Sequence, residues 1–208
     1  MKTIGITQRV DVTATGERRD ALDQCWCALL QDLGVRLVPI PNQLGQVPSF
    51  VKDLRLEGII LSGGNDIAAV AGAKNAAPER DTLETQLIDY CAAQQIPMLG
   101  ICRGLQMLVH HYGGKLTPIS GHVAIRHSVQ PRSDLFPVEP FEVNSFHHFG
   151  IATKSLPSAL EVLATDVRGN VEAARHKDSP QFGVMWHPER EDVWAAHDLS
   201  LLRKVFAL

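Results

Sequence analysis

A cysteine flanked by glycines is the residue of this sequence best suited to covalent chemistry. Cys102 lies in Gly100-Ile101-Cys102-Arg103-Gly104, between an apolar run at 97–101 and a helical pattern at 103–112. This is the spacing of a nucleophile elbow, in which a tight strand-to-helix turn lifts one side chain above the sheet. The helix N-terminus favours the thiolate form. A cysteine is often only a core residue, but the two glycines favour Cys102 as a nucleophile.

A histidine and a glutamate two residues apart provide the base that such a nucleophile needs. Among nine histidines, His187 stands at the end of an apolar strand, in Trp186-His187-Pro188-Glu189. Residues i and i+2 of an extended chain point to the same side, so Glu189 can reach the imidazole. Pro188 biases the preceding residue toward extended backbone. The sequence therefore predicts a Cys102–His187–Glu189 relay, in which the carboxylate orients the imidazole.

Two backbone amides are predicted to stabilise the oxyanion. The N–H of Arg103, directly after the nucleophile, points to where the charge would form. Ser62-Gly63-Gly64 follows a buried strand, and its glycines allow the backbone to approach a ligand closely. We expect the N–H of Gly64 to be the second donor, although a plain turn would also explain a glycine pair. The lysine and the spacing of a phosphate-binding loop are missing.

The elements that must position these residues alternate in the first half of the chain. Strands are expected to start near residues 3, 35, 58 and 97, and helices are expected at 17–33, 80–94 and 103–112. The second half contains short β segments at 160–165, 171–176 and 182–186, and a last helix at 192–206. This pattern predicts an α/β fold, a three-layer sandwich with a mostly parallel central sheet and an added β portion. The 208 residues are expected to form one domain, 1–208.

Composition narrows the classes of partner. The chain is 45% hydrophobic and 21% charged, with a net charge of -3 and scattered Lys and Arg, so we expect neither a nucleic-acid nor a membrane partner. No apolar run approaches the ~20 residues of a membrane span, and no signal peptide is visible, so a cytoplasmic protein is expected. Cys25 and Cys27 face apart by roughly 200° on a helix, which favours packing. We predict no metal and no cofactor.

Three motifs together resemble a known family. Ser62-Gly63-Gly64, Gly100 to Gln106 and Trp186 to Glu189 are similar to the class I glutamine amidotransferases, and more closely to their γ-glutamyl hydrolase branch of peptidase C26 type. The resemblance implies the class I glutamine amidotransferase-like, flavodoxin-like fold. The opening residues 4–9 and the segment 143–147 also resemble the γ-glutamyl-γ-aminobutyrate hydrolases.

The resemblance also implies residue roles. Cys102, His187 and Glu189 align with the family's catalytic triad, and Gly64 and Arg103 align with its oxyanion-hole amides. Gln106 corresponds to the glutamine that contacts the glutamyl α-amino group. The segment that lines the glutamyl site corresponds to Asn144, Ser145, His147 and His148. For the two histidines, a polar turn beside the site is the alternative.

The activity implied is hydrolysis of a γ-glutamyl amide, a small-molecule substrate, with release of glutamate and an amine or amidate. A compact group in this branch, the γ-glutamyl-CDP-amidate hydrolases of capsular phosphoramidate synthesis, has a similar opening to residues 2–9. The alternative is a glutaminase subunit that passes ammonia to a separate synthetase, and a third reading is a catalytically silent binding module. The hydrolase reading needs no obligate synthetase partner, and a homodimer stays open.

Overall fold

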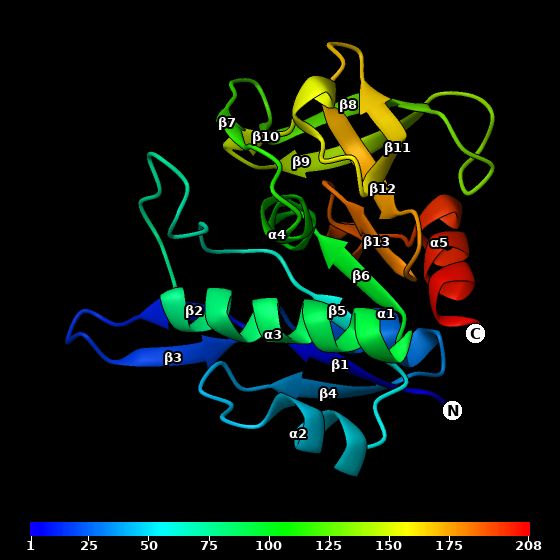
Figure 1. The fold of residues 1–208 in the computed structure, drawn as a ribbon. Coiled ribbons are helices and arrows are strands. Elements are labelled where there is room, and N and C mark those ends of the chain that lie inside the picture. Colours follow the sequence, from blue (N-terminus) through cyan, green and yellow to red (C-terminus); the bar gives the residue numbers. More distant parts are fainter.

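One nine-stranded mixed sheet organises the chain in the computed structural model, which describes residues 1–208. The strand order is β4-β1-β5-β6-β13-β12-β11-β8-β9 (Figure 1). The parallel strands are β4 (Arg36–Ile40), β1 (Thr3–Thr7), β5 (Gly58–Leu61), β6 (Met98–Ile101) and β13 (Gln181–Val184). The antiparallel strands are β12 (Val171–His176), β11 (Leu160–Asp166), β8 (Val123–Pro131) and β9 (Phe141–Phe146).

This topology confirms the predicted α/β class and corrects its proportions. The five parallel strands have the 2-1-3-4-5 order of flavodoxin-like folds, in which ligands bind beyond the carboxyl ends of the strands. The remaining four strands continue the same sheet in antiparallel pairing. The sheet is therefore mixed with a parallel core, and the added β portion is its second half.

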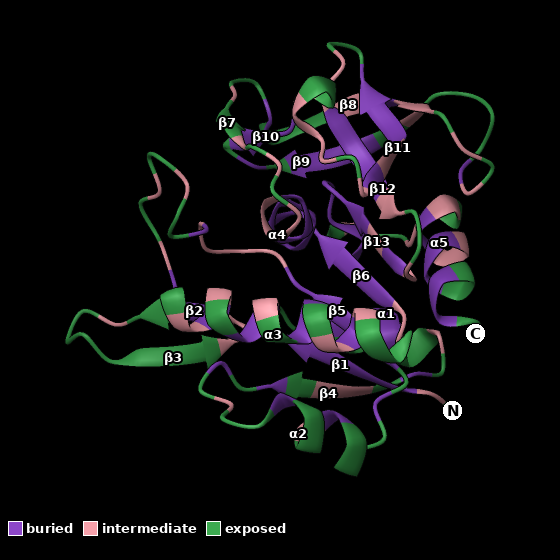
Figure 2. Cartoon of the chain, in the orientation of Figure 1, coloured by how far each residue is buried: buried purple, intermediate pink, exposed green.

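Helices cover both faces of the parallel strands, which gives the predicted three layers. On one face lie α2 (Val47–Asp53), α3 (Pro78–Gln94) and α4 (Arg103–His111), and on the other lie α1 (Cys25–Asp32) and α5 (Ala196–Phe206). Successive residues of each strand alternate between the two cores: Ile60 packs on the α1 and α5 side, and Ile59 on the α2 and α3 side. Figure 2 shows the central parallel strands β1, β5 and β6 buried between these layers, whereas the edge strand β4 is more exposed. None of the helices combines the length and apolarity needed to span a bilayer.

The helix predicted at 17–33 is wrong in its first half. Strands β2 (Arg9–Val12) and β3 (Arg18–Ala21) form a separate hairpin, and α1 begins only at Cys25. The hairpin turns at Gly16, whose positive φ of 85° favours glycine. The Asp20 carboxylate accepts hydrogen bonds from the backbone and side chain of Asn42, so tertiary contacts override helical propensity here. Cys25 and Cys27 are exposed rather than packed as expected.

Smaller elements complete the chain. They are the two-stranded pair β7 (Thr117–Pro118) and β10 (Phe149–Gly150) and the short 3-10 helices η1 (Thr153–Ser155) and η2 (Pro188–Arg190). The helix α2 has no counterpart in the sequence prediction, and α5 starts four residues later than the predicted 192.

Candidate active site

Cys102 stands on a strained turn between β6 and α4. Its φ of 51° and ψ of -99° lie in a region that residues other than glycine rarely adopt. The Cys102 N–H donates to the Val184 carbonyl over 2.7 Å, which joins the turn to the neighbouring strand β13. A Cβ atom at Gly104 would overlap the carbonyl oxygen of Leu61, so the closeness of α4 to β5 requires glycine. The structure thus has the elbow that the glycine spacing predicted.

His187 and Glu189 follow β13, the strand beside β6. The His187 Nδ1 and Glu189 Oε1 atoms are 2.7 Å apart, and both side chains are only 2% exposed. Because a carboxylate only accepts, Nδ1 donates and Nε2 is the atom left for the reaction. Burial lowers the pKa of His187, but the charge and hydrogen bonding of Cys102 and Glu189 outweigh it and raise that pKa to about 9. The imidazole therefore favours its protonated form at neutral pH.

The loop after β5 is held from below by an arginine. The Arg80 side chain is fully buried, and its guanidinium donates to the carbonyls of Ser62 over 2.5 Å, Gly63 over 3.0 Å and Gly64 over 2.7 Å. Because each peptide is planar and trans, the N–H of Gly64 points opposite to the Gly63 carbonyl, away from Arg80. A Cβ atom at Gly63 would lie 2.7 Å from Cε1 of His187, so this position also must be small.

A buried ionic cluster joins this loop to the elbow. Glu84 accepts from the Nε of Arg80 and the hydroxyl of Thr7, each over 2.8 Å, and also pairs with Arg103. Arg103 also binds the Asp81 carboxylate. Burial favours the neutral acid, but the two guanidinium charges hold the pKa of Glu84 below its usual value. Sequence reasoning missed Arg80 and Glu84, because an Arg–Glu pair four residues apart on a helix is typical of an exposed face.

A pocket of about 400 Å³ opens beside Cys102. Among its lining residues are seven of the predicted site residues, namely Gly64, Cys102, Arg103, Gln106, His147, His148 and His187. The amide of Gln106 donates to the Phe149 carbonyl over 3.0 Å. This bond fixes the amide so that its acceptor oxygen is the atom available to an ammonium group. The structure therefore brings together the nucleophile, the histidine, both amide positions and Gln106.

Asn144 and Ser145 do not line this pocket, in contrast to the expectation. The Asn144 amide brackets the backbone of His187: Oδ1 accepts from its N–H over 2.9 Å, and Nδ2 donates to its carbonyl over 2.8 Å. The Ser145 hydroxyl donates to the His122 carbonyl over 2.8 Å. Because their polar atoms are hydrogen-bonded to other parts of the protein, neither side chain is free to bind a ligand. Asn144 instead positions the backbone of His187.

The sequence analysis also missed the cations at the pocket. Arg9, Lys74 and Arg190 line it together with the aromatic ring of Phe146, which is 39% exposed. The guanidinium of Arg190 lies 4.7 Å above the centre of the Phe146 ring. These cations come from three distant segments, so no local cluster of basic residues in the sequence indicates that they share a site. Together they make the pocket wall suited to an anionic, planar group.

Comparison with known proteins gives consistent matches. The family model of peptidase C26 matches residues 2–189. A γ-glutamyl-CDP-amidate hydrolase of Campylobacter jejuni is 35% identical over 207 residues, covering 99% of this chain and 98% of that protein. One subunit of the glutamine-hydrolysing GMP synthase of Methanocaldococcus jannaschii is 33% identical over 164 residues, covering 77% and 78%. A glutamine amidotransferase structure from Thermotoga maritima shares the fold, with a TM-score of 0.68 at 17% identity over 99% of this chain and 82% of that one. These matches confirm the resemblance inferred from the motifs.

Proposed function

The chain belongs to the peptidase C26 family and is a class I glutamine amidotransferase-like hydrolase, and from that premise we propose that it hydrolyses a γ-glutamyl amide with a nucleotide amidate as leaving group. The observation that carries the chemistry is that Cys102 and His187 line one pocket, while Glu189 accepts a hydrogen bond from the Nδ1 of that imidazole. The Campylobacter jejuni relative is named for γ-glutamyl-CDP-amidate, and its match covers nearly the whole chain. A role in capsular phosphoramidate synthesis is part of the same proposal.

In the first half-reaction, the Cys102 thiolate attacks the γ-carbonyl carbon and forms a tetrahedral intermediate. The backbone N–H groups of Gly64 and Arg103 stabilise its oxyanion. The protonated His187, whose pKa is raised to about 9, gives its Nε2 proton to the leaving nitrogen. The C–N bond then breaks, the amidate departs and a glutamyl thioester remains on Cys102.

In the second half-reaction, water replaces the amidate. Neutral His187 takes a proton from the water, and the resulting hydroxide attacks the thioester carbonyl. Collapse of this intermediate releases glutamate and restores the thiolate beside the imidazolium. Glu189 holds the same imidazole nitrogen protonated throughout, because its hydrogen bond to Nδ1 is made in both states.

The pocket wall supports an anionic leaving group. Arg9, Lys74 and Arg190 supply three cationic side chains around the reacting cysteine, and Phe146 offers a partly exposed aromatic face beside Arg190. Guanidinium groups suit phosphate oxygens because they bind them in a bidentate manner. An aromatic face suits a nucleobase. An uncharged amine would use neither feature.

The test is glutamate release from a panel of γ-glutamyl compounds: γ-glutamyl-CDP-amidate, an uncharged γ-glutamyl alkylamide and free glutamine. We expect the nucleotide substrate to exceed glutamine in kcat/KM on the order of 100-fold, since only it uses the cations. Arg190→Gln should reduce this advantage and leave the alkylamide rate unchanged. Cys102→Ala should abolish turnover of all three, with no acyl adduct by mass spectrometry. Equal rates for all three substrates would refute the leaving-group proposal, and activity in Cys102→Ala would refute the mechanism.

A glutaminase subunit is the second candidate, favoured by the similarity to the archaeal GMP synthase subunit over 77% of the chain. It uses the same nucleophile but predicts glutamine as the best substrate and a strong increase in rate when a synthetase chain is added. The panel separates the two functions, because the hydrolase turns over its substrate without any partner chain.

A further inference from the structure

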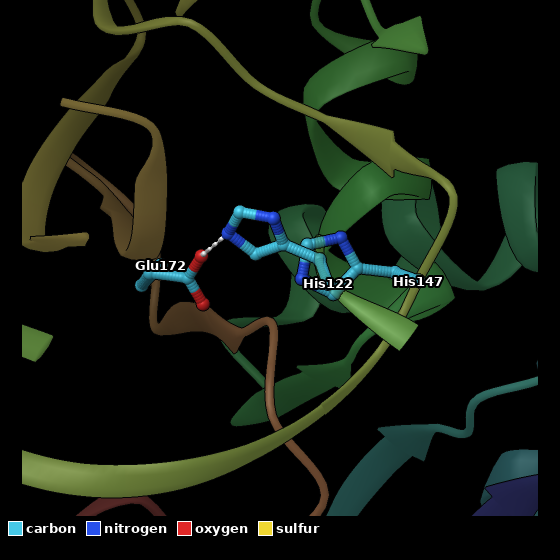
Figure 3. Close-up of side chains that lie close together, drawn as sticks. All are labelled: His122, His147 and Glu172. Carbon is cyan, nitrogen blue, oxygen red and sulfur yellow. Dashed lines mark ion pairs between the residues drawn. The ribbon is translucent and has the colours of Figure 1, made fainter. Parts of the chain in front are cut away.

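Three chemically compatible side chains meet beside the pocket, outside the Cys102–His187–Glu189 group. His122 precedes β8, His147 follows β9 and Glu172 lies in β12, and all three are buried. One ligating atom from each lies within 4.8 Å of the others. Figure 3 shows the three side chains close together. Two imidazoles and a carboxylate form a donor set typical of transition-metal sites. The proposed mechanism uses neither His122 nor Glu172.

Both imidazoles direct their Nε2 atom toward this cluster, and that of His147 has no other partner. The Nδ1 of His147 is 3.0 Å from the Phe149 carbonyl, and the Nδ1 of His122 is 3.3 Å from the Ser120 carbonyl. A carbonyl only accepts, so the Nδ1 of His147 carries the proton and the Nε2 of its neutral ring is an acceptor. The Nε2 of His122 is 3.1 Å from the Asp166 carboxylate, which also only accepts, so this nitrogen donates until a metal takes the place of its proton. The Nε2 of His147 is buried and has no hydrogen-bond partner. Metal-ligating histidines have this arrangement, with the distal N–H donated to a carbonyl or carboxylate.

Glu172 is a buried carboxylate without a hydrogen bond. Its side chain is 1% exposed, and neither oxygen has a hydrogen-bond partner. Its neighbours are the Nε2 atoms of His122 and His127, at 4.0 and 3.7 Å. The nearby Asp166 is different, because it accepts from the backbone of Arg168 and Asn170 over 2.8 Å each. The hydrogen bonds of the turn after β11 account for the buried Asp166 carboxylate, whereas no hydrogen bond in the protein satisfies the Glu172 carboxylate.

We propose that His122, His147 and Glu172 bind a divalent transition-metal ion of the Zn²⁺ class. Ligand distances of about 2.0–2.2 Å would bring tetrahedral donors to about 3.3 Å from one another. The 4.0 Å between His122 Nε2 and Glu172 Oε1 therefore closes by less than an ångström. The Nε2 of His122 is also 3.1 Å from Asp166 Oδ2, and this contact is exchanged for the metal when it binds. The nitrogen donors disfavour Mg²⁺ and Ca²⁺.

The ion would also stabilise one wall of the pocket, because His147 lines it. This site is independent of the identity of the substrate, so its test needs no turnover. Zn²⁺ and Co²⁺ are the probes, in a Cys25→Ser/Cys27→Ser background, because these two exposed thiols would bind the same metals. Competition with a chromophoric chelator gives the stoichiometry and the Kd.

We expect one equivalent of Zn²⁺, and Co²⁺ visible bands without a thiolate-to-metal charge-transfer band, which excludes ligation by Cys102. Glu172→Gln should weaken binding by at least about 100-fold, because it removes a ligand rather than an outer partner. The matched variant Glu161→Gln, on the neighbouring strand β11, should bind like the parent.

Thermal unfolding separates a lost ligand from a lost fold. Without metal, Glu172→Gln should have a Tm at least equal to the parent's, since the amide carries no charge. Added Zn²⁺ should raise the Tm of the parent and not that of the variant. Substoichiometric binding by the parent, a thiolate band, or equal Zn²⁺ affinity in Glu172→Gln would each overturn the proposal.

Discussion

Replacing Glu189 by glutamine removes one charge from the site and leaves its shape nearly unchanged. The amide oxygen of glutamine can still accept the Nδ1 proton of His187, which the carboxylate now accepts over 2.7 Å. A hydrogen bond to a charged group contributes about 1.5–3 kcal/mol and a neutral one about 0.5–1.5 kcal/mol. The difference of about 1.4 kcal/mol corresponds to about one pKa unit. The pKa of His187 is therefore expected to fall from about 9 to roughly 8.

Two measurements depend on this value. The proposed leaving-group step needs protonated His187, so kcat/KM of the parent should decline above about pH 9. In Glu189→Gln the decline should begin about one pH unit lower. Glu161→Gln is the matched control, because that carboxylate pairs with Arg175 rather than with any residue of the site.

Stability should follow the same linkage. The folded-state pKa of His187 is raised above its ordinary 6.5, so its contribution is complete below pH 6.5 and lost as the pH rises through about 9. This window corresponds to about 3 kcal/mol in the parent and about 2 kcal/mol in Glu189→Gln. Urea unfolding at the two ends of the window measures both. If the decline of kcat/KM at high pH begins at the same pH in a normally folded Glu189→Gln variant as in the parent, the contribution of Glu189 to the raised pKa of His187 is refuted.

Two further substitutions test how the site is positioned. Arg80→Met should destabilise the fold by about 3–5 kcal/mol in urea unfolding, because Glu84 loses a buried partner. The control Arg18→Met, at an exposed ion pair, should change the free energy of unfolding by less than about 0.5 kcal/mol. Equal losses in the two variants would contradict the role of Arg80 in holding the loop at 62–64. Asn144→Ala unpairs the N–H of His187 and removes one of the two donors to its carbonyl, so we expect kcat to fall with KM unchanged. A rise in KM alone would indicate the substrate contact predicted from sequence.

The reacting groups were predictable because their signals are local. The elbow around Cys102 needs glycine on both sides of one turn, and Glu189 reaches His187 because two residues of extended chain separate them. The parallel core followed from strands that alternate with helical patterns. The elbow and the histidine–glutamate pair each depend on residues fewer than about five positions apart, and each strand or helix of the parallel core is itself a local pattern.

The supporting groups were hidden because their partners are distant in sequence. Arg80 has the pattern of an exposed helix pair, yet the fold places it under the loop at 62–64. The Asn144 amide and the backbone of His187 are 43 residues apart. The hairpin at 9–21 was hidden for the same reason, since contacts of Asp20 with Asn42 override the helical propensity of its charged residues.

The antiparallel half of the sheet is best understood as part of the site. Parallel pairing of β6 with β13 places Ile101 beside Val184, and this register brings Cys102 near His187. His187 lies beyond the paired residues of β13, and Asn144, in β9 of the antiparallel half, accepts from its N–H and donates to its carbonyl. The parallel half thus carries the proposed nucleophile, while the antiparallel half holds the backbone of its proposed base. Loosening β9 should therefore impair chemistry before it impairs the parallel core.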